Sequence, residues 1–224
     1  QIFEELVHYR SKGIRFFNFV DEMLLPDFLD DLSTLIRQQK LDIHWQCTLK
    51  PMDSFTPELF NKMYEAGCRL ITWGIESGNQ KILDLMRKGT TVEQMHSCLK
   101  HSSDAKIKNH CLIILGFPGE TEEEFEDTKS FLESNRQHID AVIASTFLLY
   151  ENSEIFENPE RFGITKIENK GQLQRHYIYE IKKGWTYDQA LLVHNANQDF
   201  FASFNTFSNY LNTFRDHALI YYSL

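Results

Sequence analysis

The sequence lacks several features that would assign it to a specialised class of protein. It has no apolar run approaching the ~18 residues needed to cross a bilayer. It has no excess of positive charge, because 23 Lys and Arg face 32 Asp and Glu, a formal net charge of −9. That balance disfavours a broad nucleic-acid-binding surface. These absences predict a cytoplasmic protein without a membrane segment.

The four cysteines also lack a recognisable pattern. Cys47, Cys68, Cys98 and Cys111 form no CxxC or other short chelating cluster, so their spacing indicates no zinc or iron–sulfur site. Without a secretory context, their even number does not argue for disulfides. We therefore expect buried thiols, and no metal ligand among the residues of this chain.

The composition and its patterning indicate a folded α/β protein. Of the 224 residues, 42% are hydrophobic and 25% charged, as in ordinary globular domains. Strand-like runs at 14–20, 43–49, 69–75, 111–115 and 141–149 alternate with helical patterns. Such βαβ units have right-handed crossovers and parallel strands. A β/α barrel, whole or partial, and an open doubly wound sheet both satisfy this order.

Two neighbouring strands carry a polar face. Gln46, Thr48 and Lys50 alternate with apolar residues along the second strand. Thr72, Gly74 and Glu76 do the same along the third. A parallel strand covered on both faces should be hydrophobic on both, so this face is expected to line a ligand-filled cavity. The alternative is that one of these strands lies at an edge of the sheet.

Both ends of the pattern are unusual. A helical stripe begins at Ile2 with no strand before it, so we expect a first barrel strand to be missing from this chain; a protein that simply begins with a helix is the alternative. We expect a partial barrel over 1–150 and a mainly helical extension over 151–224. An apolar stripe over 190–214 predicts one long helix, packed outside the barrel or across an open end. Packing against a partner helix, or self-association through this helix, is the alternative.

The carboxyl ends of the strands concentrate small and acidic residues. They include Asp21 and Glu22 after the first strand, Lys50 after the second, Gly74 to Gly78 after the third, and Gly116 to Glu120 after the fourth. Ligands of barrels and open α/β sheets bind at these ends. Carboxylates there suit an amine, ribose hydroxyls or a metal ion, and glycines let the backbone approach a ligand.

The series GIESG at 74–78, KGTT at 88–91 and GFPGET at 116–121 resembles the radical S-adenosylmethionine superfamily. The likeness covers about residues 1–150 and is greatest to the branch with methylthiotransferases and cobalamin-binding enzymes. It implies a partial β/α barrel that binds S-adenosylmethionine and a [4Fe–4S] cluster. Such enzymes cleave the sulfonium reductively to a 5′-deoxyadenosyl radical, using an external electron donor.

The resemblance also implies positions for the cofactor. Asp21 and Glu22 match positions near the methionine end, and Glu76 and Ser77 match positions for ribose or methionine contacts. Ile114 and Gly116 border the adenine in the family, and Leu148 lies in the segment that closes its other side. Gln46, Thr48 and Lys50 would then face the cofactor and substrate cavity.

One departure from the family bears directly on activity. The CxxxCxxC loop, whose thiolates hold the cluster in this family, is absent from the sequence. We expect the cluster ligands to lie outside this chain, and the chain alone to be inactive and to bind S-adenosylmethionine weakly. The resemblance allows cobalamin as a further cofactor through a separate domain.

Two other functions compete with a radical enzyme. A cluster-less relative could keep the barrel as a ligand- or protein-binding module. A barrel-type metal hydrolase is disfavoured, because His44, His96, His101 and His110 offer no HxH or HExxH spacing. The sequence does not reveal the substrate, although its negative charge disfavours nucleic acid as a partner of this piece.

Overall fold

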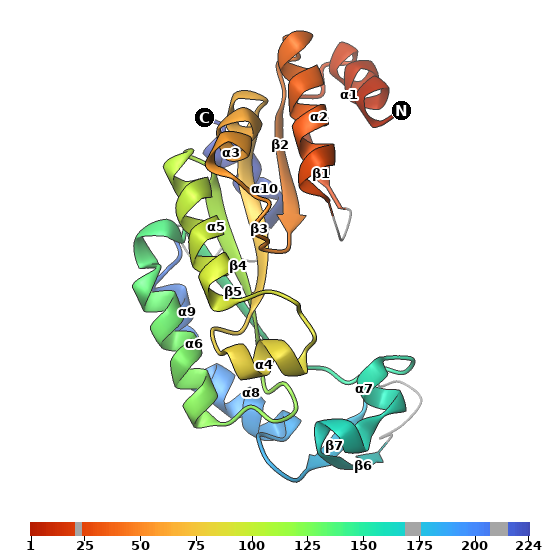
Figure 1. The fold of residues 1–224 in the computed structure, drawn as a ribbon, viewed down its shortest axis with the longest axis vertical. Helices are drawn as coiled ribbons and strands as arrows, with labels where there is room; N and C mark the ends of the chain where they lie inside the picture. The colour runs from red at the N-terminus through yellow and green to blue at the C-terminus, as the bar shows by residue number, and fades with distance from the viewer. Residues whose placement is uncertain (21–23, 169–175, 207–214) are drawn as a thin grey trace.

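A computed structural model describes residues 1–20, 24–168, 176–206 and 215–224, without the side chains of 215 and 216. Its centre is a parallel sheet of β1 (Phe16–Phe19), β2 (His44–Leu49), β3 (Cys68–Glu76), β4 (Lys108–Leu115) and β5 (Ala141–Thr146). The strands lie side by side in chain order (Figure 1). A doubly wound sheet would reverse its order at a switch point. The order is therefore that of a barrel left open along one side, as expected.

The register shows that the polar strands are interior. β2 pairs with both β1 and β3, and β3 pairs with both β2 and β4. The alternative that one of these strands lies at an edge is therefore wrong. Their polar residues face the concave side of the curved sheet.

Helices cover the convex side of the sheet. They are α2 (Pro26–Gln38), α3 (Pro57–Glu65), α5 (Val92–Asp104) and α6 (Glu122–Ser134), with α1 (Ile2–Ser11) beside α2 and the short α4 (Gln80–Leu85) after β3. Their starts follow local signals: Pro57 follows the Thr56 N-cap, and Thr91 and Gln94 form a capping box. Buried apolar residues of these helices pack on Trp45 and Trp73 of the sheet.

A buried amide ties this convex layer together. Asn109 on β4 accepts a 2.8 Å hydrogen bond from the Trp73 indole nitrogen. Its own amide nitrogen donates to the Leu99 carbonyl at 3.0 Å and to the His138 carbonyl at 2.8 Å. All of its polar atoms are thus satisfied inside the core, which explains why an amide is tolerated there.

The extension begins with a small hairpin lobe that the sequence patterning did not reveal. It comprises α7 (Glu154–Glu157), the 3₁₀ turn Pro159–Phe162, and antiparallel β6 (Ile164–Glu168) and β7 (Ile178–Ile181). The lobe lies beside the carboxyl ends of the barrel strands (Figure 1). Phe162 packs there against Phe117, and Arg87 pairs with Glu154 at 2.6 Å.

The expected long helix over 190–214 is wrong in its described part. It divides into α8 (Tyr187–Ala196) and α9 (Gln198–Ala202), and residues 207–214 lie outside the described part of the chain. The break falls at Asn197, whose side-chain amide caps the Val193 carbonyl at 2.9 Å. The apolar stripe continues across this break because both helices pack on β5.

In the described part of the chain, side chains and one backbone amide, rather than a strand, cover the outer edge of β5. The Asn205 side-chain oxygen accepts from the Val142 amide at 3.0 Å, and the Thr206 amide donates to the Asp140 carbonyl at 3.0 Å. The His194 ring hydrogen bonds to the Ala144 backbone.

The last helix, α10 (Arg215–Tyr222), packs on the concave face of the sheet against β1, β2 and β3 (Figure 1). Ala218 and Leu219 are buried there. The Tyr222 hydroxyl lies 3.1 Å from His110 Nε2 on β4. α10 therefore lies over the amino-terminal part of the concave face. Among the described helices, none has the length and apolarity to span a membrane.

Candidate functional site

The carboxyl ends of the five parallel strands meet at one edge of the sheet. We call the group Lys50, Gly74, Glu76, Lys88 and Gly89 at this edge the mouth. The first three come from the ends of β2 and β3, and the other two from the loop between α4 and α5.

An ion pair forms the centre of the mouth. Lys88 Nζ lies 2.8 Å from Glu76 Oε1, and both side chains are mostly buried, at 23% and 14% exposed. Glu76 adopts a left-handed backbone with φ 65°, next to a register shift between β3 and β4. Such irregularities re-aim a side chain at the end of a strand. Here they turn the carboxylate towards Lys88.

Gly74 leaves the space that this pair occupies. A Cβ at this position would come 2.9 Å from Lys88 Nζ and 3.0 Å from Glu76 Oε1. The loop carrying Lys88 returns to the mouth because α4 is only six residues long. The ammonium therefore lies directly over the backbone of β3.

Lys50 approaches the same space from β2. Leu49 pairs with Trp73 in the parallel register, so Lys50 follows opposite Gly74. Its Nζ would be 3.4 Å from a Cβ on Gly89. Two ammonium groups and one carboxylate therefore lie beside the two glycines of the mouth.

The polar residues of β2 and β3 below the mouth lie on the concave face of the sheet. Thr48 is half-buried beside Thr72, its partner in register on β3. Gln46 is 7% exposed, and its Oε1 has no hydrogen-bond partner among the described residues. An unsatisfied buried amide oxygen is costly, which is typical of a position that receives a hydrogen-bond donor from a ligand or water.

Ser77 lies apart from the mouth. Its hydroxyl is fully buried, lies 3.1 Å from Thr128 Oγ1 on α6, and accepts from the Asn79 amide at 3.1 Å. The side chain thus holds the start of α4 against α6. The structure does not bring it together with Glu76, the preceding residue.

Gly116, at the end of β4, is packed under the extension. Its φ is 75°, its amide donates to Glu120 Oε2 at 2.5 Å, and a Cβ would come 2.3 Å from Ala190 Cβ on α8. Ile114 is half-buried on the concave face two residues earlier, and Leu148 is half-buried after β5. Both are apolar borders on the β4–β5 side of the barrel.

Glu120 is the strongly perturbed carboxyl group of this loop. It is 1% exposed, and burial raises its pKa to about 7 against the opposing effect of the Gly116 amide. Glu124, on the first turn of α6, has a pKa lowered to about 2, first by the Lys81 side chain and then by Thr121. The surroundings thus raise the pKa of Glu120 and lower the pKa of Glu124.

The predicted residues Asp21 and Glu22 lie outside the described residues, so the structure places neither. Lys88 is the residue that sequence reasoning missed. KGTT was noticed as a motif, yet no role was given to its lysine. The short segment 80–85 between GIESG and KGTT was the signal that this lysine returns to the strand end.

The cysteines do not fit an iron–sulfur cluster. All four are buried and belong to the convex core, and the described part of the chain holds no group of three His, Cys, Asp or Glu that could bind a metal. Burial raises the pKa of Cys98 to about 11 and raises that of Cys111 further. Thiols held in the neutral form are poor ligands for iron.

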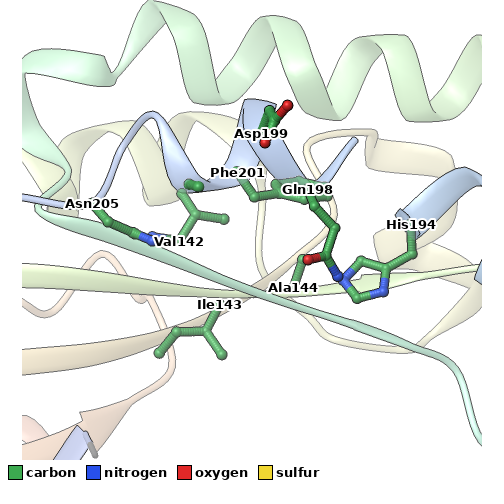
Figure 2. A pocket seen from close by; sticks show the side chains of 9 residues that line it. Val142, Ile143, Ala144, His194, Gln198, Asp199, Phe201 and Asn205 are labelled. Atoms are coloured by element: carbon green, nitrogen blue, oxygen red, sulfur yellow. The ribbon is translucent and has the colours of Figure 1, made fainter. Parts of the chain in front are cut away.

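A separate hollow of about 400 Å³ lies beside β5, away from the mouth. Figure 2 shows Val142 and Ile143 on opposite sides of the strand, with His194 and Gln198 near Ala144. Burial lowers the pKa of His194, against the opposing effect of its hydrogen bond to the Ala144 backbone.

Comparison with known proteins supplies an independent test of the family. An uncharacterized methyltransferase of Pyrococcus horikoshii is 35% identical over 137 residues, which cover 58% of this chain and 29% of that protein. The bacteriochlorophyllide d C-12(1)-methyltransferase of Chlorobaculum tepidum is 26% identical over 180 residues, or 77% of this chain and 37% of that protein. The chain therefore spans about a third of the length of these relatives.

Solved structures agree on the fold. The cobalamin-dependent S-adenosylmethionine radical enzyme OxsB, with aqua-cobalamin bound, superposes with a TM-score of 0.68 at 15% identity, over 91% of this chain and 37% of that one. Coproporphyrinogen III oxidase from Escherichia coli gives 0.62 at 14% identity, over 90% and 44%. The model of the Radical SAM superfamily matches residues 1–132, more than half of the sequence. The chain belongs to the Radical SAM superfamily.

Proposed function

We propose that the mouth binds S-adenosylmethionine and that this chain is the cofactor-binding core of a radical enzyme. The observation that carries the proposal is the Glu76–Lys88 pair over Gly74. The methionine end of the cofactor bears one ammonium and one carboxylate. A carboxylate and an ammonium at the carboxyl edge of the sheet complement both.

Four other predicted residues support this assignment, whereas Ser77 does not contribute to it. Ile114 and Leu148 offer apolar borders for the adenine, and Gln46 offers an acceptor deeper in the barrel. Gly116 contributes by letting the β4 end turn under the extension, with its carbonyl held by Tyr179. The family resemblance alone assigns Asp21 and Glu22 to the methionine end.

The cofactor chemistry needs a group that these residues do not hold. S-adenosylmethionine, when reduced by a [4Fe–4S] cluster, supplies a 5′-deoxyadenosyl radical that abstracts hydrogen from a substrate. The described cysteines do not fit that cluster, so the role of this chain is to bind and orient the cofactor. Cobalamin stays an expectation from the resemblance, since no described side chain singles it out.

Calorimetry with S-adenosylmethionine tests the binding site. We expect weak binding by the 224-residue chain, and at least about tenfold weaker binding by Glu76→Gln and by Lys88→Gln, since each loses a charge-assisted contact. Lys62→Gln is the matched control, because Lys62 pairs with Asp30 at 2.6 Å on the convex side. Equal binding by all four proteins would refute the site, and tight binding without metal would refute the expected dependence on the cluster.

A cluster-less binding module is the second candidate, favoured by the buried cysteines alone. The complete product of the gene, reconstituted anaerobically with iron and sulfide and reduced with dithionite, separates the two. Release of 5′-deoxyadenosine supports the radical enzyme. Binding of S-adenosylmethionine without release supports the module.

A further inference from the structure

Lys50 differs from the other half-buried lysines of the described chain. Each of the others has a carboxylate within 4 Å: Lys62 pairs with Asp30, Lys88 with Glu76, Lys108 with Asp140 and Lys129 with Glu126. Lys50 has no ion pair and no hydrogen bond to any described residue. The remaining described lysines without a carboxylate partner are exposed on the surface, where water solvates the charge.

Leaving a partly desolvated ammonium without an anion costs free energy. A lysine can escape this cost by extending into water, because its stem is long and flexible. Lys50 is instead half-buried, with its Nζ beside Gly89 and its backbone opposite Gly74. Gly89 carries no side chain to fill the space beside the Lys50 ammonium.

Among the described residues, the charged side chains of the mouth include one ammonium more than they include carboxylates. Glu76 and Lys88 match the ammonium and carboxylate of one methionine end. Lys50 then adds a positive charge that this cofactor does not balance, in a chain whose net charge is −9. A protein with this net charge does not attract anions in general. An anion at Lys50 would therefore be held by local contacts.

We propose that Lys50 binds an oxyanion, a phosphate or carboxylate, that the substrate carries beside the cofactor. The inference rests on the proposed function for the identity of the neighbouring ligand. Lys50 would then contact the substrate rather than the cofactor, and the substrate would belong to the class of anionic compounds. The substrate bears an anionic group within reach of β2.

Lysine side-chain NMR tests this assignment on the 224-residue chain. With labelled lysines, the Lys50 Cε–Nζ resonances are followed during titration with inorganic phosphate, at constant ionic strength maintained with chloride to screen surface effects. We expect a saturable shift at Lys50 that persists when S-adenosylmethionine is present. Lys50→Gln should weaken phosphate binding at least about tenfold, because a charge-assisted contact is lost. Lys12→Gln, at an exposed lysine, should leave it unchanged.

The outcomes separate this proposal from the proposed function. If S-adenosylmethionine displaces phosphate from Lys50, its own carboxylate is the anion, and the substrate assignment is overturned while the proposed function stands. If phosphate shifts Lys50 but S-adenosylmethionine binds nowhere, the anion site is supported and the proposed function fails. Absence of any saturable shift at Lys50, or an equal loss in Lys12→Gln, overturns the proposal.

Discussion

The Tyr179 hydroxyl on β7 donates a 3.1 Å hydrogen bond to the Gly116 carbonyl at the end of β4. This contact joins the hairpin lobe to the strand end that borders the mouth. The same loop is held from the other side, because the Trp185 amide donates to the Glu120 carbonyl at 3.0 Å. The extension therefore positions the β4 end of the candidate site.

Tyr179→Phe should lower the free energy of unfolding by about 1 kcal/mol, since it removes one hydrogen bond from a buried carbonyl. Tyr150→Phe is the control, because Tyr150 is 48% exposed. Urea denaturation of both variants measures the effect. Equal stabilities would show that the extension does not support the loop through this bond.

Gly116→Ala should destabilise the protein by roughly 2–4 kcal/mol, because it adds backbone strain to an overpacked contact with Ala190. Gly13→Ala is the control that measures backbone strain without a packing clash. The φ of Gly13 is 91°, and nothing lies within 4 Å of the added Cβ. We expect about 1 kcal/mol there. A cost at Gly116 no larger than that at Gly13 would contradict the packing under α8.

Glu120 should make stability depend on pH. Its folded pKa of about 7 lies above the ordinary value of 4.5 because the carboxyl is buried. The folded state therefore holds the proton more tightly than the unfolded state, and the free energy of unfolding falls as pH rises from 4.5 to 7, by roughly 3 kcal/mol at most.

Glu120→Gln should remove the pH dependence of stability that Glu120 causes, while its amide oxygen still accepts from the Gly116 amide. The measurement is the difference in unfolding free energy between the wild type and Glu120→Gln across pH 5 to 8, at about unit intervals. Taking the difference cancels the histidines that titrate in the same window. A difference that does not change with pH would contradict the raised pKa.

The four cysteines should be unreactive in the folded protein, because each is buried and those on β4 and α5 have raised pKa values. A disulfide-exchange reagent should label all four in denaturant and react only slowly without it. Fast labelling of any cysteine under native conditions would place that thiol at the surface.

Leu219→Ala should cost about 2–4 kcal/mol, because Leu219 is 2% exposed where α10 meets the sheet. Ile220→Ala is the matched control, since Ile220 is 41% exposed on the same helix. We expect less than about 0.5 kcal/mol from it. Similar costs for both residues would show that α10 does not cover the concave face in solution.

Much of the barrel could be predicted from the sequence because its signals are local. Capping residues such as Thr91 and the apolar–polar alternation through Gln46 and Thr48 act within one helical turn or strand. Boundaries were less accurate: β4 begins at Lys108 rather than at 111, because Asn109 is a polar residue satisfied inside the core. β5 ends at Thr146, and Leu149 instead bridges to Tyr177 in the lobe.

The rest depended on contacts between distant segments. The hairpin of β6 and β7 has short strands without a clean alternation, and the separation of α8 from α9 depends on one capping amide at Asn197. Lys88 was missed for the same reason. Only the folded chain shows that its ammonium returns to Glu76, twelve residues earlier.

The edge of β5 has a consequence for the behaviour of the protein in solution. A barrel that does not close leaves strand edges, and bare edges recruit strands from other molecules into aggregates. At this edge, Asn205 occupies the Val142 amide and the Thr206 amide occupies the Asp140 carbonyl. These contacts block the addition of another strand at Asp140 and Val142. Asn205 and Thr206, which follow α9, therefore hinder edge-to-edge polymerisation.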